Sequence, residues 1–169
     1  MAETIPLSEF RVEKRRAPGT LTLANGEIVH GAFFVAGGSP QHDGPERVGE
    51  LLNGATHFFP FERNDSGDPR TVLYNRSIIV TVALTTAEAR LVPGYDVATK
   101  RTVSLQLSTG ARITGIAGIY RPEGRDRVSD WTLDPAMFRY VETPEATLLV
   151  NVQHILEISE LQEGPPAWH

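Results

Sequence analysis

The sequence has no cysteine and very few lysines, two against 14 arginines. Without cysteine the chain can form neither a disulfide framework nor a thiolate metal site, and it has no cysteine nucleophile. No stretch reaches the roughly 18 uncharged apolar residues that a membrane span needs, and residues 1–16 lack the apolar run of a signal peptide. We therefore expect a cytoplasmic protein whose only contact with the inner membrane, if there is one, is peripheral.

The composition is otherwise that of an ordinary globular protein. Of the 169 residues, 40% are hydrophobic and 22% are charged, which excludes a disordered, collagen-like or coiled-coil chain. Sixteen basic and 21 acidic residues give a net charge of −5, which disfavours nucleic acid as a partner. Composition alone indicates no activity.

Three blocks of the sequence recur in the same order, which predicts an internal duplication. The offset between matched positions is 84 residues in the first block, 80 in the second and 76 in the third, and each decrease falls in a polar connection. The matched positions are Leu21, Leu23, Gly26, Val29, Gly31 and Val35 with Leu105, Leu107, Gly110, Ile113, Gly115 and Ile119; Arg47, Val48, Glu50, Leu51, Phe58 and Glu62 with Arg127, Val128, Asp130, Trp131, Phe138 and Glu142; and Leu73, Asn75, Ile79 and Val82 with Leu149, Asn151, Ile155 and Ile158.

Each copy has the pattern of a small β-unit. Alternating apolar residues on both sides of Asn25-Gly26, and of Thr109-Gly110 in the second copy, predict a hairpin. Residues 46–53 have helical spacing over one or two turns, and two further strands are predicted over 56–62 and 71–85. The predicted fold is therefore mainly β, with two tandem β-β-α-β-β small barrels and short helical turns.

These patterns divide the chain into five segments. We expect an N-terminal arm over residues 1–16, a first barrel repeat over 17–85, a linker over 86–100, a second repeat over 101–161 and a C-terminal tail over 162–169. A unit of about 60 residues buries only roughly 60% of its unfolded surface and is marginally stable alone. The two repeats are therefore expected to pack on each other or on a partner.

Several runs resemble a known type of domain. Residues Glu50-Leu51-Leu52-Asn53, 58–61 and 72–79 resemble a family of small uncharacterised bacterial β-domains with an Sm-like or SH3-like barrel, whereas the second copy has Trp131-Thr132-Leu133 in place of Leu51-Leu52-Asn53. The resemblance implies a barrel fold and no known chemistry. The whole chain also resembles a soluble accessory subunit of a bacterial photosynthetic reaction-centre and antenna complex. That resemblance implies docking on the cytoplasmic face of a membrane complex.

Motifs for enzymatic chemistry are missing from the sequence. It has no glycine-rich phosphate loop with a lysine, no serine in a nucleophile elbow and no histidine pair with metal-ligand spacing. We therefore expect a non-catalytic protein without cofactor or metal. One enzyme hypothesis stays open, a cryptic site between the copies around His42, Asp43 and His57.

An RNA-binding function is a second alternative. Asn75 and Asn151 are matched between the copies, each before a strand of β-branched residues. In Sm-like RNA binders an asparagine near this position bonds bases, so the resemblance implies such a role here. The structural interpretation is that each asparagine caps a turn or sits at a bulge. The acidic charge and the lack of a basic stripe favour the structural interpretation.

Positions at which the copies differ are candidate contacts to partners. Phe34 is opposite Gly118 and Phe59 is opposite Arg139. If Phe58 faces the core, strand alternation places Phe59 outward, where it would form an apolar patch with Phe34; alternatively both pack between the copies or beneath the linker. The corresponding face of the second copy is expected to carry arginines that suit protein interfaces. These arginines are Arg112, Arg121, Arg125, Arg127 and Arg139. The leading hypothesis is a binding or scaffold protein that docks on a larger protein assembly.

Overall fold

The computed structural model describes residues 14–54, 56–65, 67–122, 124–162 and 168. Most of the predicted N-terminal arm and of the predicted C-terminal tail therefore lies outside the described residues.

The described chain is mainly β, as predicted. Its first half contains β1 (Lys14–Leu23), β2 (Ile28–Ala36), α1 (Val48–Leu52), β3 (Phe58–Arg63), β4 (Arg70–Asn75), the 3-10 turn η2 (Arg76–Ile78) and β5 (Ile79–Leu84). Its second half contains β6 (Thr99–Leu107), β7 (Arg112–Ile119), α2 (Val128–Trp131), β8 (Phe138–Glu142), β9 (Thr147–Asn151), the 3-10 turn η4 (Val152–His154) and β10 (Ile155–Glu160). A third 3-10 turn, η3 (Glu88–Leu91), lies between the halves. The order of elements is the same in both halves.

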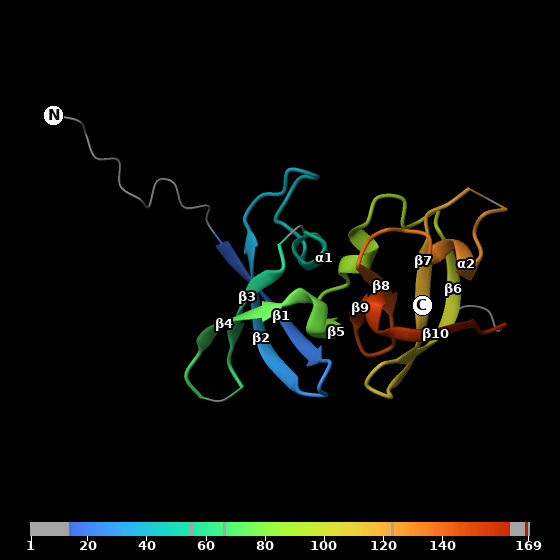
Figure 1. Cartoon of the computed structure of the whole chain (residues 1–169). Helices are drawn as coiled ribbons and strands as arrows, with labels where there is room; N and C mark the ends of the chain where they lie inside the picture. The colour runs from blue at the N-terminus through green and yellow to red at the C-terminus, as the bar shows by residue number, and fades with distance from the viewer. Residues whose placement is uncertain (1–13, 55, 66, 123, 163–167, 169) are drawn as a thin grey trace.

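The ten strands form one open antiparallel sheet rather than two separate sheets. The strand order is β10-β6-β7-β8-β9-β5-β1-β2-β3-β4, so β10 and β4 are the two ends. The halves meet where β5 pairs with β9, with Thr81 opposite Val150 and Leu84 opposite Thr147. Figure 1 shows these two strands side by side between the halves. The predicted tandem-barrel duplication is not confirmed, because main-chain hydrogen bonds continue from one half into the other.

Local turn chemistry explains the hairpins and one difference from prediction. Gly26 and Gly110 adopt φ values of +86° and +90°, a left-handed conformation that glycine tolerates, and they close the β1–β2 and β6–β7 hairpins. The single strand predicted over residues 71–85 is instead divided into β4 and β5 by η2. The division occurs at Asn75, whose side chain accepts a hydrogen bond from the Ser77 N–H at 3.0 Å and so begins the 3-10 turn.

The apolar side chains form two clusters that the halves share. The first cluster is built around Phe33, Leu52 and Phe61 of the first half, but it also contains Phe138 of β8. The second is built around residues of β6 and β7, but it also contains Val80 of β5. Each half therefore completes the core of the other. Among the described residues, no helix is long and apolar enough to cross a membrane.

Truncation of Phe138 to alanine should lower the free energy of unfolding by about 3–5 kcal/mol, because it leaves a cavity in a closed cluster. Since Phe138 belongs to one half and fills the core of the other, the loss should appear in a single transition during urea unfolding. The control is Ile28→Ala at an exposed position, with an expected change within about 0.5 kcal/mol. Two separate transitions, or equal effects of the two variants, would contradict the shared packing.

Candidate functional site

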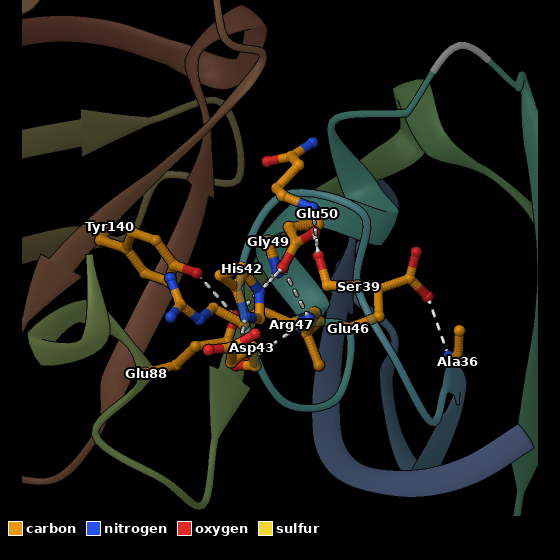
Figure 2. Close-up of polar contacts among 12 residues, drawn as sticks. Ala36, Ser39, His42, Asp43, Glu46, Arg47, Gly49, Glu50, Glu88 and Tyr140 are labelled. Carbon is orange, nitrogen blue, oxygen red and sulfur yellow. Dashed lines mark hydrogen bonds and ion pairs between the residues drawn. The ribbon is translucent and has the colours of Figure 1, made fainter. Parts of the chain in front are cut away.

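The polar cluster nearest to the predicted enzyme site surrounds Glu50 on α1 (Figure 2). The Glu50 carboxylate accepts hydrogen bonds from Ser39 Oγ at 2.7 Å and from the Arg47 N–H at 3.1 Å, and its other contact is His42 Nε2. The second ring nitrogen of His42 lies 2.8 Å from the Asp43 carbonyl oxygen. The cluster therefore fastens the loop before α1 to the first turn of that helix.

This geometry is not that of an activated nucleophile. In a catalytic triad the serine bonds to the histidine, which in turn bonds to the carboxylate. Here Ser39 and His42 both bond to the same carboxylate, so the serine hydroxyl does not donate to the histidine and the order of a catalytic triad is absent. His57 is exposed, and within the described part of the chain its side chain makes no hydrogen bond to His42 or Asp43. Of the predicted residues, the structure brings the His42 ring into contact with the Asp43 main chain.

Hydrogen bonds set the ionisation of this pair. The Asp43 carbonyl and then the Glu50 carboxylate raise the pKa of His42 above its ordinary value. Burial opposes the charge on Glu50, but hydrogen bonds from Ser39, His42 and the Arg47 N–H outweigh it and hold the pKa of Glu50 below its ordinary value. Both shifts favour the charged form of the group, which suits a structural ion pair.

A second carboxylate, Glu88 in η3, connects the linker to both halves. Its two oxygens accept hydrogen bonds from the N–H groups of Val48 and Gly49 at 3.1 and 2.8 Å, and one of them also accepts from Tyr140 Oη at 2.6 Å. Glu88 is buried; burial and the charge of Glu88 raise the pKa of Tyr140 well above its ordinary value. The sequence predicted only a linker here, because no local pattern shows that a carboxylate meets the start of a distant helix.

Two asparagines hold the halves together. The Asn53 side chain accepts a hydrogen bond from the Phe138 N–H at 2.8 Å and donates one to the Phe138 carbonyl at 3.1 Å. Asn151 accepts from the Gln153 N–H at 2.9 Å and donates to the Ile79 carbonyl at 2.9 Å. Asn151 is completely buried, so its amide cannot bond an RNA base. The capping interpretation of the matched asparagines is confirmed.

The predicted orientation of Phe58 and Phe59 is wrong. Phe59 is 3% exposed and stacks on Phe33 with 5.7 Å between ring centroids, whereas Phe58 is 55% exposed. Phe34 is half-buried and lies 5.5 Å from the Arg16 guanidinium, so it forms no patch with Phe59. The prediction placed Phe58 in the core because it matches Phe138. Phe138 itself packs in the cluster of the other half of the molecule, so its burial does not carry over to Phe58.

The predicted arginine face does not form as one surface. Arg112 begins β7 and pairs with Glu157 at 2.7 Å, whereas Arg121 follows the opposite end of that strand. Arg121 and Arg125 are exposed, but Arg139 is buried, 4.5 Å from the Trp131 ring centroid. Alternation along a strand cannot show which arginine lies beneath another element.

A small pocket lies between the linker and the second half, and Asn53 of the first half also lines it. It has a volume of about 200 Å³ and lies beneath the linker that carries η3. Buried Glu142 lies 3.6 Å from Arg90 at its wall, and burial together with a hydrogen bond to Glu142 raises the pKa of Tyr95 to about 12. Among the described residues, no group of three His, Asp or Glu side chains could hold a metal ion.

Three of the large exposed apolar side chains lie at the two ends of the sheet. At one end, Leu73 is exposed on β4 and Phe58 on the neighbouring β3; at the other end, Leu156 is exposed on β10. Next to Leu156 is a pocket of about 420 Å³ between α2 and β10, which Trp131 and Ile155 help to line. The matched positions in the other half are buried apolar residues, so the repeats indicated that Phe58, Leu73 and Leu156 lie on apolar faces of their strands. The repeats did not show that these faces are exposed to solvent.

Comparison of the chain with models of protein families, with curated proteins and with solved structures finds no match. The resemblance to Sm-like domains and to a photosynthetic accessory subunit therefore stays a prediction.

The His42–Glu50 contact should stabilise the fold most between the ordinary pKa of a glutamate, 4.5, and that of a histidine, 6.5. Because the pKa of His42 is raised in the folded protein, the stability that His42 contributes is lost as the pH rises through that raised pKa. Because the pKa of Glu50 is lowered in the folded protein, the stability that Glu50 contributes is lost as the pH falls through that lowered pKa. The difference in unfolding free energy between wild type and His42→Asn should therefore be larger at about pH 5.5 than at about pH 8.5. A difference that does not change with pH would show that the pair is not ionised.

Replacing Glu88 with alanine should lower the free energy of unfolding by about 2–3 kcal/mol, because two buried N–H groups and the hydroxyl of half-buried Tyr140 lose a charged acceptor. Tyr140→Phe removes only one donor and should cost about 1 kcal/mol. Urea unfolding of both variants beside wild type measures the effects. A Glu88→Ala protein as stable as wild type would contradict the bridging role of this carboxylate.

Proposed function

We propose that the protein is a non-catalytic binding or scaffold protein, built from two repeats of one small β-barrel unit, that docks on other proteins through the free ends of its sheet. The observation that carries the proposal is the position of three large exposed apolar residues, Phe58, Leu73 and Leu156. Leu73 and Leu156 lie on β4 and β10, the strands that end the sheet within the described part of the chain, and Phe58 lies on the neighbouring β3. The outer edge of such a strand is where an added strand of a partner binds.

The arrangement of strands supports the two repeats. Within the sheet the first half has the order β5-β1-β2-β3-β4 and the second half the order β10-β6-β7-β8-β9, which are the same order in each half's own numbering. Asn75 and Asn151 begin equivalent 3-10 turns. A side chain at Gly31 or at Gly115 would overlap with the carbonyl oxygen of Glu62 or of Glu142 respectively, which explains why glycine is matched at both places.

The chemistry of the polar groups supports a non-catalytic role. Glu50 and Glu88, which lie in the most elaborate polar clusters, use their oxygens to accept hydrogen bonds from main-chain N–H groups and neighbouring side chains. A general base needs a free lone pair aimed at a substrate proton. In its sharper form, which rests on the resemblance, the partner is a photosynthetic reaction-centre and antenna complex.

Capture experiments on the full-length protein should show that the sheet ends bind. The double variant Leu73→Glu/Leu156→Glu places a charge at each end of the sheet, and Val97→Glu, also at an exposed position, is the matched control. Proteins that co-purify with tagged wild type from native cells should be retained by Val97→Glu and lost from the double variant, because burying an unpaired carboxylate opposes binding. Mass spectrometry identifies them, and untagged copies of this chain count as partners.

Wild type that captures neither another protein nor a copy of itself would contradict the docking function. Equal capture by the double variant would contradict the use of the sheet ends. Absence of the protein from purified photosynthetic complexes would remove the sharper form alone.

A further inference from the structure

The two free ends of the sheet are the counterparts of the two strands that pair inside the molecule. We call residues counterparts when the offsets of 84, 80 or 76 match them. At the offset of 76, β9 is the counterpart of β4, and β10 is the counterpart of β5. Since β5 and β9 pair within the chain while β10 and β4 end the sheet, the molecule contains one completed junction and both separate sides of a second.

We infer that these two sides bind each other between copies of the chain, with β4 of one copy pairing with β10 of the next, head to tail. The inference rests on the proposed docking function and names a second copy of this chain as the partner. The internal β5–β9 junction is the template for the contact.

Burial at the internal junction supports this partner. Three apolar side chains are buried where the two halves meet. Their three counterparts, at the free ends of the sheet, are exposed. The exposed fractions are 0% for Leu149 against 65% for Leu73, 0% for Val80 against 67% for Leu156, and 2% for Phe138 against 55% for Phe58. Each exposed side chain at the free ends therefore corresponds to a side chain that the internal β5–β9 junction buries.

The pocket beside β10 offers a place for one of these side chains. At the internal junction Phe138 packs in the first cluster together with Leu52 of α1. The counterpart surface of the second half is the pocket of about 420 Å³ between α2 and β10, lined by Trp131 and Thr132 among others. Phe58 of a second copy would enter this pocket as Phe138 enters the first cluster, and burying an aromatic ring is a large apolar gain.

The strand register and one side-chain amide of the expected β4–β10 contact also correspond to those of the β5–β9 junction. At the internal junction Val82 lies opposite Leu149. The counterpart of Val82 is Ile158 and the counterpart of Leu149 is Leu73, so we expect Ile158 of one copy to lie opposite Leu73 of the other. Asn151 donates its amide hydrogen to the Ile79 carbonyl across the internal junction at 2.9 Å. Asn75 uses its amide oxygen for Ser77, and within the described part of the chain its amide nitrogen has no hydrogen-bond partner. The counterpart acceptor is the Ile155 carbonyl of the next copy.

One difference separates this contact from its template. At the internal junction Asn53 makes two hydrogen bonds to the main chain of Phe138, whereas its counterpart is Leu133, which is exposed. Leu133 would contact Phe58 of the other copy through apolar surface instead. Because the contact joins two different surfaces, each added copy leaves one end free, so the assembly is a ring where the rotation closes and a filament where it does not.

Two charged variants of the full-length chain test the head-to-tail geometry. Leu73→Glu blocks the β4 end and Leu156→Glu blocks the β10 end. Both positions are exposed, so each variant should keep the circular dichroism spectrum of wild type. Each should also keep its urea midpoint at a protein concentration too low for assembly, because self-association stabilises the folded state. Wild type at tens of micromolar should sediment as an assembly larger than a dimer. Each variant alone should sediment as a monomer, and an equimolar mixture should form a one-to-one dimer, because each supplies the end that the other lacks. Val97→Glu is the control and should assemble like wild type.

A wild type that stays monomeric at about 100 µM would overturn the inference, as would a Leu73→Glu protein that still self-associates or a mixture that stays monomeric. These outcomes are distinct from failure of the proposed function. If the chain does not bind itself but the double variant still loses its captured proteins, the ends bind another partner; if nothing is captured either, both proposals fail.

Disulfide trapping tests the register. The chain has no native cysteine, so single substitutions give unambiguous cross-links. Mixed Leu73→Cys and Ile158→Cys proteins should form a covalent dimer on mild oxidation, because directly opposed side chains in antiparallel strands have Cβ atoms about 4.5–5.5 Å apart. The pair Leu73→Cys and Val97→Cys should cross-link at least tenfold more slowly. Equal rates for the two pairs would overturn the predicted register.

Discussion

The pairing of β5 with β9 is the contact on which the rest of the structure depends. It joins two halves that would each be a marginal unit alone, and it does so with main-chain hydrogen bonds along four opposed residue pairs. Next to this junction, Val80 of the first half packs in the second apolar cluster and Phe138 of the second half packs in the first. Since each core includes a side chain from the other half, neither core is complete until this ladder has formed.

The polar groups around this junction are arranged to satisfy buried main-chain atoms. Glu88 accepts hydrogen bonds from two N–H groups at the start of α1, and Asn53 and Asn151 bond main-chain groups of the opposite half. Buried polar groups are costly unless they are hydrogen-bonded. Carboxylates and amides that suggest chemistry by type alone are thus used to hold the linker and the two halves in one arrangement.

A junction between equivalent strands has a structural consequence. When two units of the same design join through different edges, one edge of each is used and one remains. Free edges expose main-chain donors and acceptors, and proteins commonly protect them with charge, proline or short strands. Here the outer strands carry charged residues, but they also carry Leu73 and Leu156 with most of their surface exposed. Apolar surface therefore lies where main-chain pairing is also available.

The sequence by itself determined the local features of this protein: the mainly β class, the hairpin turns at Gly26 and Gly110, and the capping asparagines. These follow from alternation and turn chemistry within a few residues. Only the tertiary structure decided that the strands share one sheet. It also decided that Phe59 rather than Phe58 is buried. Alternation fixes which residues share a face, but the choice of the buried face depends on a contact between residues far apart in the chain.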